Sequence, residues 1–168
     1  MIGFRRTVCL ALVAVSTLGP LSSVRAEQAF QRFLPLLVDL NGWQGKKPDG
    51  MSMEMPNNSM TAATRDYVRG SAQLHAGVVR GPAAAGALAP FQTGMNLQTT
   101  DGHMISSTMQ GLPVIKTFNT SQKSGAIIVA LGKDAVFNLS YNGIAEDEAV
   151  ALAEKFDLKA IQAAAQVK

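Results

Sequence analysis

The clearest pattern along the chain is an alternation of apolar side chains in the segments 125–131 and 135–141. Such alternation is typical of strands that bury one face, and the turn residues at 132–134 join the two segments as a hairpin. Two further pairs of strand-like segments surround glycine-containing turns, namely 61–69 with 72–80 and 104–110 with 114–119. The pattern therefore predicts a mostly antiparallel sheet, made of one hairpin followed by a strand meander.

Helical spacing replaces this alternation in three other parts of the chain. Apolar residues in 27–37 recur three and four positions apart, which predicts a helix that Pro35 shortens or breaks. The alanine-rich segment after Pro82 predicts a crossover helix between the hairpin and the meander. Acidic residues at Glu146 predict the start of a C-terminal helix, and Asp157 is placed to cap a further short helix.

The remaining segment, 44–58, is rich in Gly, Pro and Asn and is expected to be long and partly irregular. No internal repeat or linker divides the chain. Helices before, between and after the strands predict an α+β fold, in which N-terminal, crossover and C-terminal helices pack on a mostly antiparallel sheet.

The first 26 residues have the features of a secretory leader. Arg5-Arg6 precedes an unbroken apolar run from 8 to 15, and Val24-Arg25-Ala26 offers small residues at the cleavage positions. The apolar run is too short to cross a bilayer as a helix. We expect a signal peptide over 1–26, cleavage after Ala26, a single domain over 27–168 in the periplasm or secreted, and no membrane insertion after cleavage. The arginine pair leaves both general secretion and twin-arginine export open.

Loss of the leader changes the charge and the cysteine content. The full chain has 15 basic and 12 acidic residues, and three arginines leave with the leader, so the mature domain is neutral. A neutral domain without a basic tract argues against binding to nucleic acid. The only cysteine, Cys9, is also lost, so the mature domain has no disulfide, thiol nucleophile or thiolate ligand.

The order of elements is similar to that of a known fold. Gly42-Trp43 precedes the hairpin at 61–80, and a crossover helix, a meander over 104–141 and a helix beginning at Glu146 follow. This order resembles the MOG1/PsbP-like fold and small exported bacterial proteins without assigned activity. The resemblance covers most of the chain after the leader and implies a docking or accessory role. It supplies no catalytic motif.

Methionine is concentrated between residues 51 and 60. Met51, Met53 and Met55 alternate along the chain and Met60 follows. Alternate residues of an extended segment point to one side, and thioethers are soft ligands that select Cu(I). The cluster is therefore a candidate Cu(I) site. Packing of the methionines against apolar surface and an exposed patch for a partner protein are the other two interpretations.

The first hairpin brings further candidate residues together. If Gly70-Ser71 is a two-residue loop, Asp66 opposes His75, either as an exposed charge pair or as a carboxylate that orients the imidazole. The same register places Arg65 and Tyr67 on the apolar face. An arginine there needs a carboxylate partner or a ligand, unless the register is shifted by one residue.

Together with the lone Trp43, which is either a core anchor or a contact residue, Arg65 and Tyr67 form the candidate binding set. No phosphate loop, Rossmann glycine motif, zinc spacing or G-x-S-x-G motif is present. The sequence therefore predicts an exported soluble protein that binds an unknown protein or small ligand, without catalysis and without a cofactor. The alternative is a periplasmic Cu(I)-handling protein that uses the methionine-rich segment.

Overall fold

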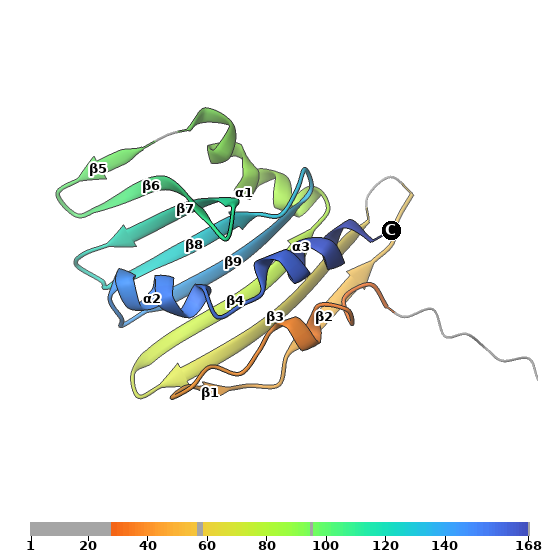
Figure 1. Cartoon of the computed structure of the whole chain (residues 1–168), viewed down its shortest axis with the longest axis horizontal. Helices are drawn as coiled ribbons and strands as arrows, with labels where there is room; N and C mark the ends of the chain where they lie inside the picture. The colour runs from red at the N-terminus through yellow and green to blue at the C-terminus, as the bar shows by residue number, and fades with distance from the viewer. Residues whose placement is uncertain (1–27, 57–58, 95, 168) are drawn as a thin grey trace, which may run out of the picture.

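The computed structural model describes residues 28–56, 59–94 and 96–167. The predicted leader and its cleavage site lie outside these residues. The described residues form an antiparallel sheet with the strand order β1-β3-β4-β9-β8-β7-β6-β5, and β2 pairs with β3 beside β1 (Figure 1). The nine strands are β1 (Gln44–Gly45), β2 (Asp49–Met53), β3 (Met60–Arg69), β4 (Ala72–Arg80), β5 (Leu97–Thr99), β6 (Gly102–Met109), β7 (Leu112–Asn119), β8 (Ser124–Ala130) and β9 (Ala135–Asn142).

Helices cover the two faces of the sheet unequally. On one face, here called the core face, α2 (Glu146–Ala153) and α3 (Leu158–Gln166) lie across the strands together with the N-terminal segment (Figure 1). On the other, the α1 face, α1 (Pro82–Thr93) covers only the end that carries Val79, Val136 and Ala130. This arrangement confirms the predicted α+β class with a mostly antiparallel sheet.

The core lies between the sheet, the C-terminal helices and the N-terminal segment. Side chains of β9 and β8 that were predicted to share a face are buried there, including Phe137 and Ile127 at 0% exposure. Phe156, from the turn between α2 and α3, packs against Phe137 with ring centroids 5.1 Å apart. The Asp157 side chain accepts a hydrogen bond from Ala160 N and caps α3, as the sequence predicted.

The N-terminal segment is less helical than its spacing predicts. Residues 29–33 form turns, and only Leu34–Leu36 form one 3₁₀ turn, η1. Pro35 stands near the start of that turn, where its missing N–H costs nothing, and its ring disfavours a helix continuing through it. The predicted apolar positions Phe33 and Leu37 are nevertheless buried.

Two short strands differ from the irregular structure predicted for 44–58, and a third, β5, lies in a part of the chain for which no strand was predicted. β1 and β2 lie within 44–58, and both pair with the same side of β3, with Gln44 opposite Val68 and Met51 opposite Ala62. β5 adds a short edge strand to β6. Pairing with a neighbouring strand, which local composition does not reveal, makes these segments extended despite Pro48 and Gly50.

The hairpin register agrees with its prediction. Gly70, with φ +59°, and Ser71 form the loop, so Arg69 opposes Ala72 and Asp66 opposes His75. The meander turn differs by two residues. Gln110 and Gly111, both with positive φ, make the turn, and Leu112 already belongs to β7.

Candidate functional site

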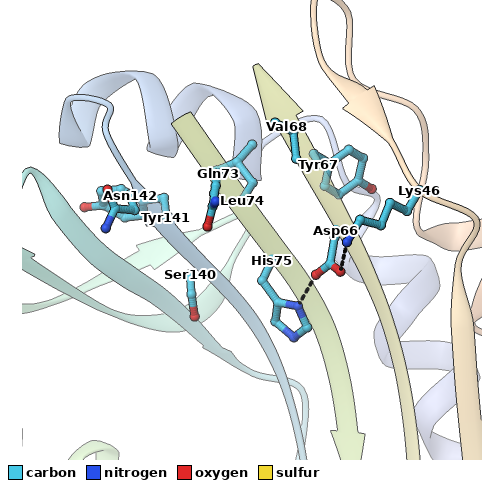
Figure 2. A pocket seen from close by; sticks show the side chains of 10 residues that line it. All are labelled: Lys46, Asp66, Tyr67, Val68, Gln73, Leu74, His75, Ser140, Tyr141 and Asn142. Atoms are coloured by element: carbon cyan, nitrogen blue, oxygen red, sulfur yellow. Dashed lines mark hydrogen bonds and ion pairs between the residues drawn. The ribbon is translucent and has the colours of Figure 1, made fainter. Parts of the chain in front are cut away.

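The part of the α1 face that α1 leaves open carries a small polar cluster. Asp66 on β3 lies between Lys46, just after β1, and His75 on β4 (Figure 2). Lys46 Nζ is 3.2 Å from Asp66 Oδ2, and His75 Nδ1 is 2.7 Å from Asp66 Oδ1. The backbone N–H of Lys46 also donates to Asp66 O at 2.8 Å. One carboxylate thus positions both a cation and an imidazole.

The electrostatics of this cluster keep Asp66 ionised. The hydrogen bond with His75 is the main cause that lowers the pKa of Asp66 below its ordinary value of 3.8. Lys46 lowers the pKa further, and partial burial acts in the opposite direction. Lys46, Asp66 and His75 are 68%, 46% and 49% exposed. Because these side chains remain open to solvent, the ion pairs serve to position groups and add little to stability.

A cavity of about 320 Å³ lies beside the cluster. On the α1 face its polar lining comes from the adjacent strands β4 and β9. His75 lies directly opposite Ser140, and Gln73 lies directly opposite Asn142. These side chains are drawn in Figure 2. The cavity is lined by Lys46, Asp66, Tyr67, Val68, Gln73, Leu74, His75, Ser140, Tyr141 and Asn142. Such a site offers several hydrogen-bonding groups around one balanced pair of charges.

Three residues on adjacent strands could in principle form a serine nucleophile activated by histidine, namely Asp66, His75 and Ser140. In the described residues, Ser140 Oγ accepts a hydrogen bond from Asn138 Nδ2 at 2.8 Å, and no hydrogen bond joins it to His75. The row therefore has the order of side chains that a catalytic serine needs, without the serine–histidine bond.

The predicted binding residues Arg65, Tyr67 and Trp43 lie on the core side of the sheet. Arg65 donates from Nη1 to Leu37 O at 2.7 Å and from Nε to Lys46 O at 2.8 Å, and it also pairs with Asp39. The carboxylate partner that the sequence analysis required for Arg65 is therefore Asp39. The register needs no shift.

Tyr67 and Trp43 are also used within the fold. Tyr67 is fully buried, and its hydroxyl donates to Val38 O at 2.7 Å. Trp43 is 8% exposed, and the Arg69 guanidinium lies over its ring at 4.4 Å. The contacts of these residues favour the core-anchor interpretation. Tyr67 also lines the cavity beside Asp66, and a ligand-binding role for Arg65 and Trp43 stays a prediction.

The methionines of residues 51–55 are not core residues. Met51, Met53 and Met55 are 49%, 43% and 45% exposed, so packing in the interior is excluded for these three. Met60 is half-buried and lies directly opposite Met53 in the β2–β3 pair. Met51 and Met53 alternate along β2 and share its exposed face. Met55 lies beyond the end of β2, and the strand register does not fix its direction.

A second charged cluster lies on the core face of the sheet, and the sequence analysis did not predict it. Glu146, the first residue of α2, is 2.8 Å from His103 Nε2 and 3.7 Å from Lys116 Nζ. Its three side chains are between 18% and 25% exposed. The sequence analysis explained Glu146 only as the start of a helix. Since β6, β7 and α2 each contribute one residue, the cluster holds the start of α2 against the meander.

No family model matches the chain, and no curated protein or solved structure was found to be similar to it. Within the described residues, no group of three or more His, Cys, Asp or Glu side chains could hold a metal ion. No helix in the same part of the chain has the length and apolar character needed to cross a membrane.

Proposed function

We propose that the protein is an exported, non-catalytic binding domain, and that it holds a small polar ligand in the cavity beside Asp66. The observation that carries the proposal is the pairing of Lys46 and His75 with one carboxylate at the wall of this cavity. A ligand-binding site needs its polar groups fixed before the ligand arrives. Here adjacent strands of one sheet fix most of them.

The chemistry of the lining supports an uncharged ligand with several hydroxyl or amide groups. Gln73 and Asn142 present amides, which both donate and accept hydrogen bonds, and Ser140 presents a hydroxyl. The charge of the Asp66 carboxylate is balanced by the Lys46 ammonium group, and His75 contacts the same carboxylate, so no unbalanced charge favours an anion or a cation. A docking or accessory role, which the resemblance to the MOG1/PsbP-like fold implies, agrees with such a domain.

Binding can be tested by NMR on the isotopically labelled protein. Sugars, polyols and dipeptides are added singly, and we expect shifts at the amides of Gln73, His75 and Asn142 for the compound that binds. Gln73→Ala and His75→Ala should weaken this binding. Gln92→Ala, an exposed glutamine on α1, is the matched control and should leave it unchanged. Shifts that map elsewhere, or no response to any compound, would contradict the proposed site.

Export is a separate part of the proposal and has its own test. The features that support it are the arginine pair, the short apolar run and the small residues before Glu27. The full chain is expressed in a Gram-negative host, and the periplasm and medium are collected. N-terminal sequencing should give Glu27 as the first residue. Protein that stays in the cytoplasm with Met1 retained would overturn the proposed export without touching the binding site.

A further inference from the structure

Three methionines lie on the same open face of the β2–β3 pair. Met53 lies directly opposite Met60, and Met51, two positions before Met53, lies opposite Ala62. Residues that oppose each other across an antiparallel pair have Cβ atoms roughly 4.5–5.5 Å apart and point to the same face. Alternate residues on one strand are about 6.5–7 Å apart. The register therefore gathers three thioethers on one patch of the sheet.

The contacts of the other side of β2 confirm which way the methionines face. The N–H of Phe30 donates to Ser52 Oγ at 3.1 Å. The Phe30 ring packs so closely on Gly50 that a Cβ there would lie 2.5 Å from Phe30 Cδ2. Since Gly50 and Ser52 alternate with Met51 and Met53, the N-terminal segment covers one face of β2 and the methionines take the opposite one.

We propose that Met51, Met53 and Met60 form a binding site for a soft monovalent metal ion, Cu(I). Neutral thioethers select Cu(I) over hard cations such as Mg²⁺ and Ca²⁺, which take oxygen ligands. The flexible methionine side chain, with its three rotatable bonds, allows sulfurs on adjacent strand positions to converge on one ion. The site goes beyond the proposed ligand cavity, because none of its residues lines that cavity.

Charged side chains of both signs lie near the methionines. Met53 borders a hollow lined by two basic and two acidic side chains, Arg32, Arg80, Glu54 and Asp134. Asp49 alternates with Met51 and Met53 along β2 and is exposed on the same face. The chain's only cysteine lies in the predicted leader, so no thiolate of the described residues competes for the metal.

The first experiment measures Cu(I) binding by competition with a chromogenic Cu(I) chelator under anaerobic, reducing conditions. We expect about one equivalent bound per chain. Met53→Leu and Met60→Leu should each weaken binding by more than the roughly 10–100-fold loss that follows removal of an outer-shell group. The triple variant with Met51→Leu should bind none. Leucine is close to methionine in volume, so each variant should unfold at the same denaturant concentration as the parent.

Two methionine variants serve as controls. Met104, half-buried on the same sheet face of β6, is replaced by leucine and should leave Cu(I) binding unchanged. Met55→Leu should also leave it nearly unchanged, since Met55 lies beyond the paired residues. Loss of binding in Met104→Leu, or a triple variant that binds like the parent, would overturn the proposed site.

The second experiment locates the metal directly and uses Ag(I), a soft monovalent ion that is stable in air. In protein with ¹³C-labelled methionine methyl groups, Ag(I) should shift the signals of Met51, Met53 and Met60. The signals of Met104 and of Met109, which is 6% exposed, should stay in place. A parent protein that binds neither Ag(I) nor Cu(I) would leave the patch as apolar surface for a partner protein, and the metal site would be wrong.

Discussion

Arg65 and Tyr67, two positions apart on β3, bind neighbouring carbonyl oxygens of the N-terminal segment. Arg65 Nη1 donates to Leu37 O and Tyr67 Oη donates to Val38 O, both at 2.7 Å. The guanidinium also lies over the Tyr67 ring at 5.2 Å. The two side chains together hold the N-terminal segment against the core face of β3, where this segment covers the core.

This contact predicts a loss of stability when the guanidinium is replaced. Arg65→Lys keeps the charge but cannot serve the carbonyls of Leu37 and Lys46 and the Asp39 carboxylate together. The free energy of unfolding should fall by about 1–3 kcal/mol, the cost of leaving such acceptors unpaired. Chemical denaturation measures the change. Arg69→Lys changes an exposed pair with Glu148 and a cation–π contact with Trp43, both of which a lysine can partly keep, and should cost less than about 1 kcal/mol. Equal losses would contradict the special role of Arg65.

Phe137 is a core position predicted from the sequence at which truncation should cost much stability. Its side chain is fully buried on β9 and packs against Phe156. Phe137→Ala should lower the free energy of unfolding by roughly 3–5 kcal/mol, because it removes a large apolar side chain and leaves a cavity. Leu97→Ala, at a residue that is 50% exposed, should change it by less than about 0.5 kcal/mol. A denaturation midpoint that barely moves for Phe137→Ala would be inconsistent with this core.

Both tyrosines should resist ionisation in the folded protein. Burial raises the pKa of Tyr67 to about 12, and burial with the Glu146 carboxylate raises the pKa of Tyr141 to about 12, from 10.0. The neutral rings therefore contribute stability that is fully present below pH 10 and is lost as the pH rises through 12. Since the chain has only two tyrosines, tyrosinate absorbance should appear near pH 12 when folded and near pH 10 in denaturant. A native transition near pH 10 would show that one ring is solvated.

The stability contributed by Asp66 should be lost at low pH, whereas that contributed by the tyrosines is lost at high pH. The folded pKa of Asp66 lies below 3.8, so its pairing contributes stability that is present above that value and is lost as the pH falls through the lowered pKa. His75→Ala removes the largest cause of the shift and should raise the pKa towards its ordinary value, more than Lys46→Ala does. An NMR titration of the Asp66 carboxyl carbon measures both. If Asp66 had the same pKa in His75→Ala as in the parent, the hydrogen bond with His75 would not be the main cause of its lowered pKa.

The exposure of the methionines predicts their order of oxidation by peroxide. Met51, Met53 and Met55, at 43–49% exposure, should convert to sulfoxide well before Met109, at 6%, because oxidation follows access to the thioether. Peptide mass spectrometry after timed exposure gives the order. The protein is kept free of metal, so that bound Cu(I) does not shield the thioethers from peroxide. Oxidation of Met109 as early as that of Met51 and Met53 would contradict the burial of Met109 at the end of β6.

The sheet could be predicted from the sequence wherever a turn fixed the register. Gly70 and Ser71 define a two-residue loop, and a two-residue loop decides which positions of the strands oppose each other. The contact between Asp66 and His75 and the placement of Arg65 on the core face both followed from that loop. The partner of Arg65, Asp39, could not be named, because no local signal places the N-terminal segment over β3.

What was missed depends on contacts between distant parts of the chain. The segment of β2 has Gly50 and a neighbouring Pro48, and its strand structure comes from pairing with β3. His103, Lys116 and Glu146 carry no shared motif, and they meet only because β6, β7 and the start of α2 are adjacent. Residue patterns report such neighbours only when turn chemistry or periodicity links them.

The way in which β3 is paired has a consequence for self-association. Long unpaired edge strands invite other chains to extend a sheet, and short strands, lysines and prolines protect against this. Beside β3 the sheet ends in two short strands, β1 and β2, separated by Lys46, Lys47 and Pro48. At the other side it ends in β5, only three residues long. A foreign strand therefore finds no continuous ladder beside β3. At the other margin β5 pairs only with Gly102–Met104, so residues 105–109 of β6 form a stretch of the described sheet margin that is open to pairing by another strand.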